Sequence, residues 1–154
     1  MKILYRKTNK LGRLVFHRQG DWIDLVCCDD MKIKKGDFAM IPLGIAMQLP
    51  KGIEAVVAPR SSTAKKYFVT QANSIGVIDN SYCGNDDEWI FPALAFRNTE
   101  IPAGNTICQF RLQPSQFATV WQRLKWALRG KLRFVETDRL SNKNRNGFGS
   151  TGDK

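Results

Sequence analysis

The sequence is poor in the residues on which many catalytic sites depend. It contains a single histidine, His17, so a site built on two or more histidines is impossible. His17 also lacks any accompanying motif that would mark it as the partner of a catalytic serine. The four cysteines form no Cys-x-x-Cys pair. Their spacing argues against a zinc site and favours reduced thiols in a cytoplasmic protein.

Long apolar runs are missing as well. The first residues contain too short an apolar run for a signal peptide. The longest weakly charged stretch, residues 38–50, is interrupted by Pro42 and Gly44 and is too short to span a bilayer. We therefore expect a soluble, cytoplasmic protein without a membrane span.

Acidic side chains are outnumbered by basic ones. The 154 residues include 14 Asp and Glu against 24 Lys and Arg, a formal net charge of +10. Such an excess favours a polyanionic partner, whether nucleotide phosphates, nucleic acid or anionic lipid, without choosing among them. With 43% hydrophobic residues, a chain of this length is expected to form one packed domain.

Helical patterns are absent before about residue 112. Turn signals separate short apolar or alternating segments, which include residues 32–34, 38–43, 53–57, 90–96 and 107–112. Short strands at this spacing are typical of an all-β barrel or sandwich.

Residues 115–130 depart from this pattern. Apolar residues recur at helical spacing at Phe117, Val120, Trp121, Leu124 and Leu128. Ser115 is a candidate N-cap and Gly130 a candidate stop. The stretch is also basic, through Arg123, Lys125, Arg129, Lys131 and Arg133. The simplest interpretation is a surface helix whose apolar stripe packs on the barrel or a neighbouring subunit. A role at a membrane surface or on nucleic acid stays open.

Two internal segments carry candidate chemistry. Residues 59–62, Pro-Arg-Ser-Ser, follow a strand-like run and offer a cation, hydroxyls and backbone N–H groups to a phosphate, although most such turns are plain surface. Asp79 ends another apolar run and could orient a water as a general base. Tyr82 follows it and offers a flat face to a sugar. A hairpin corner with an Asx-turn is the alternative for this second segment.

The C-terminal residues 141–154 combine Asn, Gly, Ser and charge, with Phe148 as the one large apolar side chain. This composition predicts a mobile terminus or a flap that orders over a phosphate ligand. In the second case, Arg145, Ser150 and Thr151 could bind phosphate oxygens, and Phe148 could stack on a base.

Three motifs taken together resemble the deoxyuridine triphosphatase (dUTPase) family. They are Pro-Arg-Ser-Ser at 59–62, Gly-Val-Ile-Asp-x-x-Tyr-x-Gly at 76–84 and Gly-Phe-Gly-Ser-Thr-Gly at 147–152. The resemblance runs from Asp21 to the tail. It is closest to the variant of Gram-positive bacteria and their phages, which shares Gly-Asp-Trp-Ile-Asp-Leu at 20–25.

This resemblance implies a jelly-roll-like β-barrel (residues 1–140, with a helical insertion at 115–130) followed by an active-site tail (141–154). It also implies a homotrimer with active sites at the subunit boundaries, where the tail closes over a site made mainly by neighbouring chains. The implied reaction is Mg²⁺-dependent hydrolysis of dUTP to dUMP and pyrophosphate. That reaction limits uracil incorporation into DNA and supplies dUMP for thymidylate synthesis.

The resemblance also assigns roles to individual residues. Asp79 would orient the water that attacks the α-phosphorus, and Asp24 would lie near the magnesium, bound through water. The nucleoside would be held by Asn73, Gly76, Val77, Ile78, Tyr82 and Phe148. The phosphates would be held by Arg60, Ser61, Ser62, Gln109, Arg145, Gly149, Ser150, Thr151 and Gly152.

The chain departs from the family pattern in three places. Asn105-Thr106 replaces the charged pair of the fourth motif, which puts a local contact in doubt. The hairpin at residues 84–91 is longer than in the commonest members and contains Trp89, so the groups there that read uracil cannot be assigned. The basic helical segment has no counterpart that we recognise in the family.

Two other functions compete with dUTP hydrolysis. A dCTP deaminase shares the barrel and the Arg-Ser-Ser site, but it needs a glutamate on the strand after the hairpin, and residues 89–96 contain no carboxylate. A regulatory binding protein could contact a protein or nucleic-acid partner through the basic segment 121–133.

Overall fold

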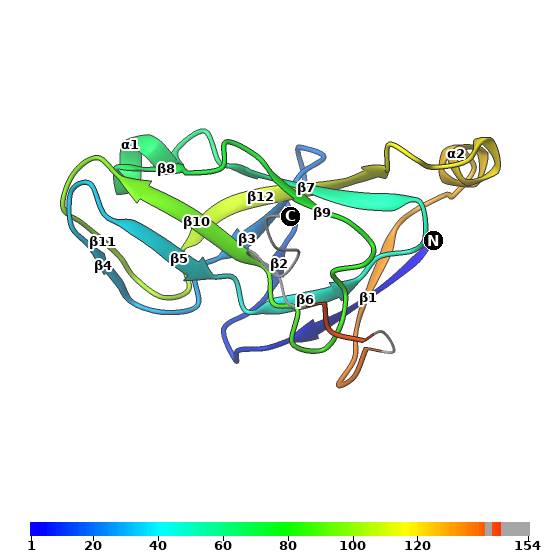
Figure 1. Ribbon diagram of the computed structural model, residues 1–154, viewed down its shortest axis with the longest axis horizontal. Coiled ribbons are helices and arrows are strands. Elements are labelled where there is room, and N and C mark those ends of the chain that lie inside the picture. Colours follow the sequence, from blue (N-terminus) through cyan, green and yellow to red (C-terminus); the bar gives the residue numbers. More distant parts are fainter. Residues whose placement is uncertain (141–142, 146–154) are drawn as a thin grey trace, which may run out of the picture.

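The computed structural model describes residues 1–140 and 143–145, and within them the chain is built mainly of strands (Figure 1). The largest sheet has the strand order β2 (Leu14–Val15), β3 (Ile23–Val26), β12 (Thr106–Pro114), β7 (Ile53–Pro59) and β9 (Gly76–Ile78). Two three-stranded sheets have the orders β13 (Arg133–Glu136), β1 (Lys2–Lys7), β6 (Ile45–Gln48) and β5 (Phe38–Pro42), β10 (Ile90–Ala95), β8 (Val69–Gln71). The strands β11 (Thr99–Ile101) and β4 (Met31–Ile33) form a separate pair.

The sequence therefore predicted the class correctly, because the all-β, jelly-roll-like architecture is confirmed. Each of the five apolar segments overlaps an observed strand, and the boundaries differ by at most two residues. The short helix α1 (Thr63–Tyr67) was not predicted. It follows β7 directly, and the Thr63 hydroxyl fixes its first turn by accepting from Arg60 N (3.1 Å) and donating to the Ile107 carbonyl (2.6 Å).

The core lies between the sheets and is closed by large aromatic side chains. Trp89 and Phe110 are fully buried and meet edge to face, with ring centroids 5.1 Å apart. The backbone of Trp89 donates to the Ile45 carbonyl and accepts from Leu43 N, so the end of the long hairpin is tied to β6. Trp89 therefore belongs to the core and offers no surface to a ligand.

The predicted helix at residues 115–130 exists, but it is shorter and starts later. Helix α2 spans Val120–Ala127 and is capped by Thr119, whose side chain accepts from Gln122 N, while the Gln122 side chain returns a bond to Thr119 N. This capping box makes Thr119, not Ser115, the N-cap. Gly130, with φ +62°, follows the helix end as expected.

The expected packing of the apolar stripe on the barrel is wrong. Its residues are exposed, namely Phe117, Val120, Trp121, Leu124 and Leu128. Instead Trp126, on another face of the helix, packs against the core. Figure 1 shows α2 at one end of the long axis of the described chain.

All four cysteines are free and buried, as expected for reduced thiols. Burial raises the pKa of Cys27 to about 11, which keeps that thiol protonated and unreactive at neutral pH. In the described part of the chain, no helix combines the length and hydrophobicity that crossing a bilayer requires.

Candidate active site

A polar pocket of about 290 Å³ opens on the five-stranded sheet, where β3, β12 and β7 run side by side. Gln109 on β12 is the register partner of both Asp24 on β3 and Ala58 on β7. This pairing brings Asp24, Arg60 and Gln109, which are far apart in the sequence, to one place. The pocket is lined by His17, Gln19, Gly20, Asp21, Trp22, Asp24, Arg60, Ser61 and Gln109.

Arg60 is fixed in this pocket by two side chains. Its Nε lies 2.8 Å from Asp24 Oδ2, and its Nη1 donates to Thr106 Oγ1 at 2.6 Å. The Asp24 side chain is nearly buried, whereas the Arg60 side chain is partly exposed, so the charge-assisted bond is shielded from water on one side. A guanidinium held on two sides keeps its remaining N–H groups aimed in one direction, as binding of a phosphate requires.

The structure adds two residues that the sequence did not single out. His17 Nε2 lies 2.8 Å from Asp24 Oδ2, so the lone histidine is part of the pocket wall. Thr106 occupies a motif position where the family has a charged residue, and its hydroxyl now holds Arg60. The departure from the family pattern at residues 105–106 could have suggested Thr106 as a site residue. No local motif marks His17 as one.

The other predicted phosphate ligands of the barrel lie around the same opening. Ser61 lines the pocket, and Ser62, the N-cap of α1, is exposed next to it. Gln109 Nε2 donates to the Pro59 carbonyl at 3.2 Å, which fixes the turn that carries Arg60. All four side chains that the sequence placed on the phosphates here are therefore together.

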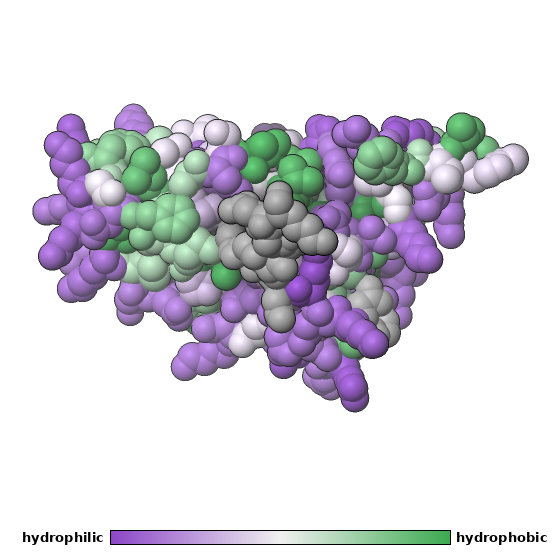
Figure 2. Space-filling view, in the orientation of Figure 1, coloured by the Kyte–Doolittle hydropathy of each residue, from purple (hydrophilic) through white to green (hydrophobic). Residues whose placement is uncertain are grey.

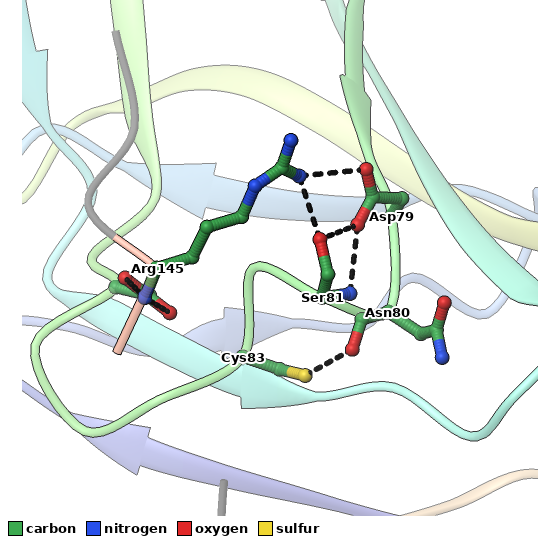
Figure 3. A network of polar contacts seen from close by, with 6 residues as sticks. Asp79, Asn80, Ser81, Cys83 and Arg145 are labelled. Carbon is green, nitrogen blue, oxygen red and sulfur yellow. Dashed lines mark hydrogen bonds and ion pairs between the residues drawn. The ribbon is translucent and has the colours of Figure 1, made fainter. Parts of the chain in front are cut away.

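A second group of predicted residues lies at the end of β9 (Figure 3). Asp79 Oδ1 accepts from Ser81 N at 2.7 Å and from Ser81 Oγ at 2.5 Å, which is the Asx-turn that was the alternative interpretation. Asp79 Oδ2 faces Arg145, whose Nη1 lies 2.8 Å away and also donates to Ser81 Oγ. The carboxylate is half exposed and remains accessible.

The environment of Asp79 favours its ionised form. Partial burial raises the pKa of this carboxyl, but the bonds from Ser81 and the charge and bond of Arg145 outweigh it, so the pKa lies below its ordinary value. A carboxylate in this state accepts a hydrogen bond from a water throughout the neutral range.

The predicted nucleoside ligands flank this aspartate. Tyr82 is half buried against the core, and its hydroxyl donates to the Glu88 carbonyl at 2.7 Å. Burial raises the Tyr82 pKa, so the phenol stays neutral. Asn73 is exposed in the turn before β9, where its Oδ1 accepts from Gln71 Nε2 (2.9 Å). The remaining three, Gly76, Val77 and Ile78, form β9 itself.

A single chain does not bring the two groups together. Ile78 pairs with Ala55, so Asp79 continues along the start of β7, whereas Arg60 follows its end. The six residue-to-residue steps from Glu54 to Arg60 correspond to about 20 Å of strand. Of the predicted tail residues only Arg145 is described; Phe148, Gly149, Ser150, Thr151 and Gly152 lie outside the described residues.

The comparisons with known proteins identify the family of the chain. The family model described as dUTPase matches residues 22–152. A prophage-derived deoxyuridine 5'-triphosphate nucleotidohydrolase of Bacillus subtilis is 50% identical over 136 residues, which cover 88% of this chain and 87% of that protein. The corresponding enzyme of Hydrogenobaculum is 35% identical over the full length of both chains.

Solved structures show the same fold. The crystal structure of a dUTPase from Streptococcus mutans has a TM-score of 0.65 and 20% identity, and the match covers 73% of this chain and 93% of that one. A mutant dUTPase of phage phi11 of S. aureus has a TM-score of 0.65 and 14% identity, and the match covers 77% and 94%. The described jelly-roll architecture is thus the fold of these dUTPase structures. The chain belongs to the dUTPase family.

Proposed function

We propose that this protein hydrolyses dUTP to dUMP and pyrophosphate. The observation that carries the proposal is the pair of prepared groups, namely a fixed Arg60 in a polar pocket and an ionised, accessible Asp79. The reaction would limit uracil incorporation into DNA and supply dUMP for thymidylate synthesis. The named relatives catalyse hydrolysis of this nucleotide, which supports the substrate.

Each group has a step in the proposed reaction. A water held by Asp79 attacks the α-phosphorus; its oxygen bonds to phosphorus, the bond from phosphorus to the bridging oxygen breaks, and pyrophosphate leaves. The proton of the water passes to the Asp79 carboxylate. Arg60, Ser61, Ser62 and Gln109 hold the phosphates, where charge develops in the transition state.

The residues around Asp79 at the end of β9 would bind the nucleoside. Tyr82 would pack against the deoxyribose and leave no room for a 2′-hydroxyl. The uracil would be bound by Asn73 and the edge of β9, that is Gly76, Val77 and Ile78. In the tail, Phe148 would cover the uracil, and Arg145, Gly149, Ser150, Thr151 and Gly152 would bind the γ-phosphate.

Magnesium fits this site as an ion held chiefly by substrate. The described residues contain no cluster of three or more His, Cys, Asp or Glu side chains suited to a metal. Asp24 supplies one nearly buried carboxylate on the wall of the phosphate pocket. One carboxylate reached through water is what an ion bound mainly to phosphates needs. When bound, Mg²⁺ would neutralise charge on the triphosphate.

We propose that the working protein is a cytoplasmic homotrimer with shared sites. The separation of Arg60 from Asp79 supports this, because a neighbouring chain can close the gap. The surface around strand β10 suits contact with a neighbouring chain. There Leu94 is the register partner of Phe38, and Phe96 packs edge to face on Phe68. Phe38, Leu94 and Phe96 are exposed, and apolar side chains gather over this sheet in Figure 2.

The structure gives the deaminase alternative no support. Strand β10 carries no carboxylate, and Glu88, which precedes it in the sequence, already accepts a hydrogen bond from Gly44 N at 2.9 Å. The decisive experiment is a pyrophosphate-release assay with Mg²⁺ against dUTP, dCTP, dTTP and UTP. We expect pyrophosphate from dUTP alone and no ammonia from dCTP; ammonia release would overturn the assignment.

A second candidate function concerns helix α2. Its exposed stripe lies among basic side chains, and residues 115–135 contain no acidic residue. We propose that this segment contacts a protein partner with an apolar groove and an acidic rim. The aliphatic Val120, Leu124 and Leu128 need an apolar surface, which a nucleic-acid backbone does not offer. Deletion of residues 116–130 should leave dUTP turnover and the trimer intact; loss of the trimer would instead assign α2 to the subunit interface.

A further inference from the structure

The side chain of Gln71, the last residue of β8, is buried next to the turn that carries Asn73. Gln71 is 3% exposed. Its Nε2 donates to the Val57 carbonyl at 3.4 Å and to Asn73 Oδ1 at 2.9 Å. Its Oε1 has no hydrogen-bond partner among the described residues. A buried acceptor without a partner costs stability, so the donor side of this amide is the side that the structure uses.

The Val57 carbonyl determines which way the Gln71 amide faces. A backbone carbonyl only accepts hydrogen bonds, so the atom turned toward it must be Nε2. With the amide reversed, two acceptor oxygens would face each other, and Nε2 would be buried without an acceptor. The correctly turned amide presents a donor to Asn73, which accepts through Oδ1. The Asn73 Nδ2 is therefore turned away from Gln71.

The turn between β8 and β9 holds Asn73 in this position. Ser74 N donates to the Gln71 carbonyl at 3.0 Å, and Ile75 N donates to the Asn73 carbonyl at 2.6 Å. Ser74 has a φ of +60°, a conformation that residues other than glycine adopt at a cost. Gly76 leaves room beside the amide, since a Cβ there would lie 3.2 Å from Gln71 Nε2. Asn73 itself is exposed, so its Nδ2 is available to a ligand.

A donor at Asn73 favours uracil over cytosine. Asn73 precedes β9 and Asp79 follows it, so the strand separates the amide from the carboxylate. In a nucleotide that lies along β9 with its phosphates toward Asp79, position C4 of the base is far from the sugar and near Asn73. Uracil has a carbonyl at C4, which accepts from Nδ2. Cytosine has an amino group there, which would place two donors against each other.

Building on the proposed function, we propose that Gln71 is a positioning residue for base selection, which holds Asn73 with its Nδ2 toward C4 of the pyrimidine. Gln71 does not touch the substrate itself, because it is buried and its donor is already used. Replacement of Gln71 should therefore change the choice of base more than the rate of the chemical step.

Exchange of side-chain amide protons tests this orientation in the unaltered protein and needs no turnover. The Asn73 Nδ2 protons should exchange rapidly with solvent and should be slowed by dUMP, whereas the Gln71 Nε2 protons should exchange slowly throughout. NMR on isotopically labelled protein measures both rates. Slow exchange at Asn73 without nucleotide would show that Nδ2 faces the protein, and this result would overturn the proposal.

Base selectivity tests the consequence. We expect Gln71→Met to raise KM for dUTP about tenfold with a nearly unchanged kcat, because the freed Asn73 amide can then also present Oδ1. The inhibition constant of dCTP as a competitor should not rise with it. On an Asn73→Ala background, Gln71→Met should have little further effect. Gln48→Met, the same replacement on β6, is the control and should leave both constants in place.

Three results would count against Gln71 in this role. They are an unaltered KM in Gln71→Met, an equal rise for dUTP and dCTP, and additive losses in the double variant. Thermal melts show whether Gln71→Met folds; if it does not, the exchange rates of the unaltered protein decide. An unaltered protein that releases no pyrophosphate from dUTP would contradict the proposed function instead, since the exchange measurement is independent of turnover.

Discussion

At the scale of single residues, Asp79 has the strictest requirement, because its carboxylate must both accept a proton and fix a water. Asp79→Asn keeps the size and the turn but removes the base. We expect kcat to fall at least about a hundredfold, the usual scale for a positioned base, while dUTP still binds. Single-turnover kinetics and binding of a non-hydrolysable analogue measure the two effects. Unchanged hydrolysis would rule out Asp79 as the base.

The low pKa of Asp79 gives a second prediction. Arg145 stabilises the charged form, so its removal in Arg145→Ala must raise the Asp79 pKa. A carboxyl-carbon NMR titration should show the Asp79 midpoint below its ordinary value in the unaltered protein and at higher pH in the variant. Arg139→Ala, which removes another exposed arginine of the same segment, should leave the midpoint in place. A midpoint that ignores Arg145 would show that the ion pair does not form in solution.

Thr106 tests how Arg60 is held. Thr106→Val keeps the shape and removes the oxygen that accepts from Arg60. We expect KM for dUTP to rise about tenfold, the scale of one hydrogen bond to a charged group, with a smaller change in kcat. Thr106→Ser keeps the hydroxyl and should behave like the parent. Equal kinetics for valine and serine would mean that Asp24 alone orients Arg60.

At the scale of elements, the tail is expected to be needed for chemistry and not for folding. Its described root is bonded to the hairpin, whereas the sheets and the core are complete without it. Removal of residues 145–154 should abolish most turnover while far-ultraviolet circular dichroism and sedimentation still report a folded trimer. A truncated protein that fails to fold would assign the tail a structural role.

The elements also show what the sequence could predict. The strands were predictable because apolar residues and turn signals alternate locally, and the ends of β7 and β9 carried recognisable motifs. The direction of the α2 stripe was not predictable, since periodicity marks an apolar face of a helix but cannot say whether that face meets the core. Trp126 packs inward, and the more regular stripe faces outward.

The pocket around Asp24 and the position of Arg145 depend on contacts between residues that are distant in the sequence. His17 contacts Asp24 across the connection between β2 and β3, and Asp87 accepts a hydrogen bond from Arg145 N, 58 residues away. Pairings of this kind arise from tertiary packing. The family resemblance indicated the ligands of the substrate, but not the residues that hold those ligands in place.

At the scale of the whole molecule, the account depends on sites shared between subunits. Asp79 follows β9 beside the start of β7, whereas Arg60 follows the end of β7. In the proposed function, the two groups therefore meet on one nucleotide only across a subunit boundary. Part of the chain's excess of basic residues attracts the proposed substrate, because dUTP is a polyanion.

The most direct measurement mixes two inactive proteins. Homotrimers of Arg60→Ala and of Asp79→Asn are each expected to hydrolyse almost no dUTP. After unfolding and joint refolding in equal amounts, about a quarter of the sites should contain both intact groups if each site draws independently on two chains. We therefore predict recovery of about a quarter of the parent activity. Mixed trimers as inactive as either parent variant would contradict the account.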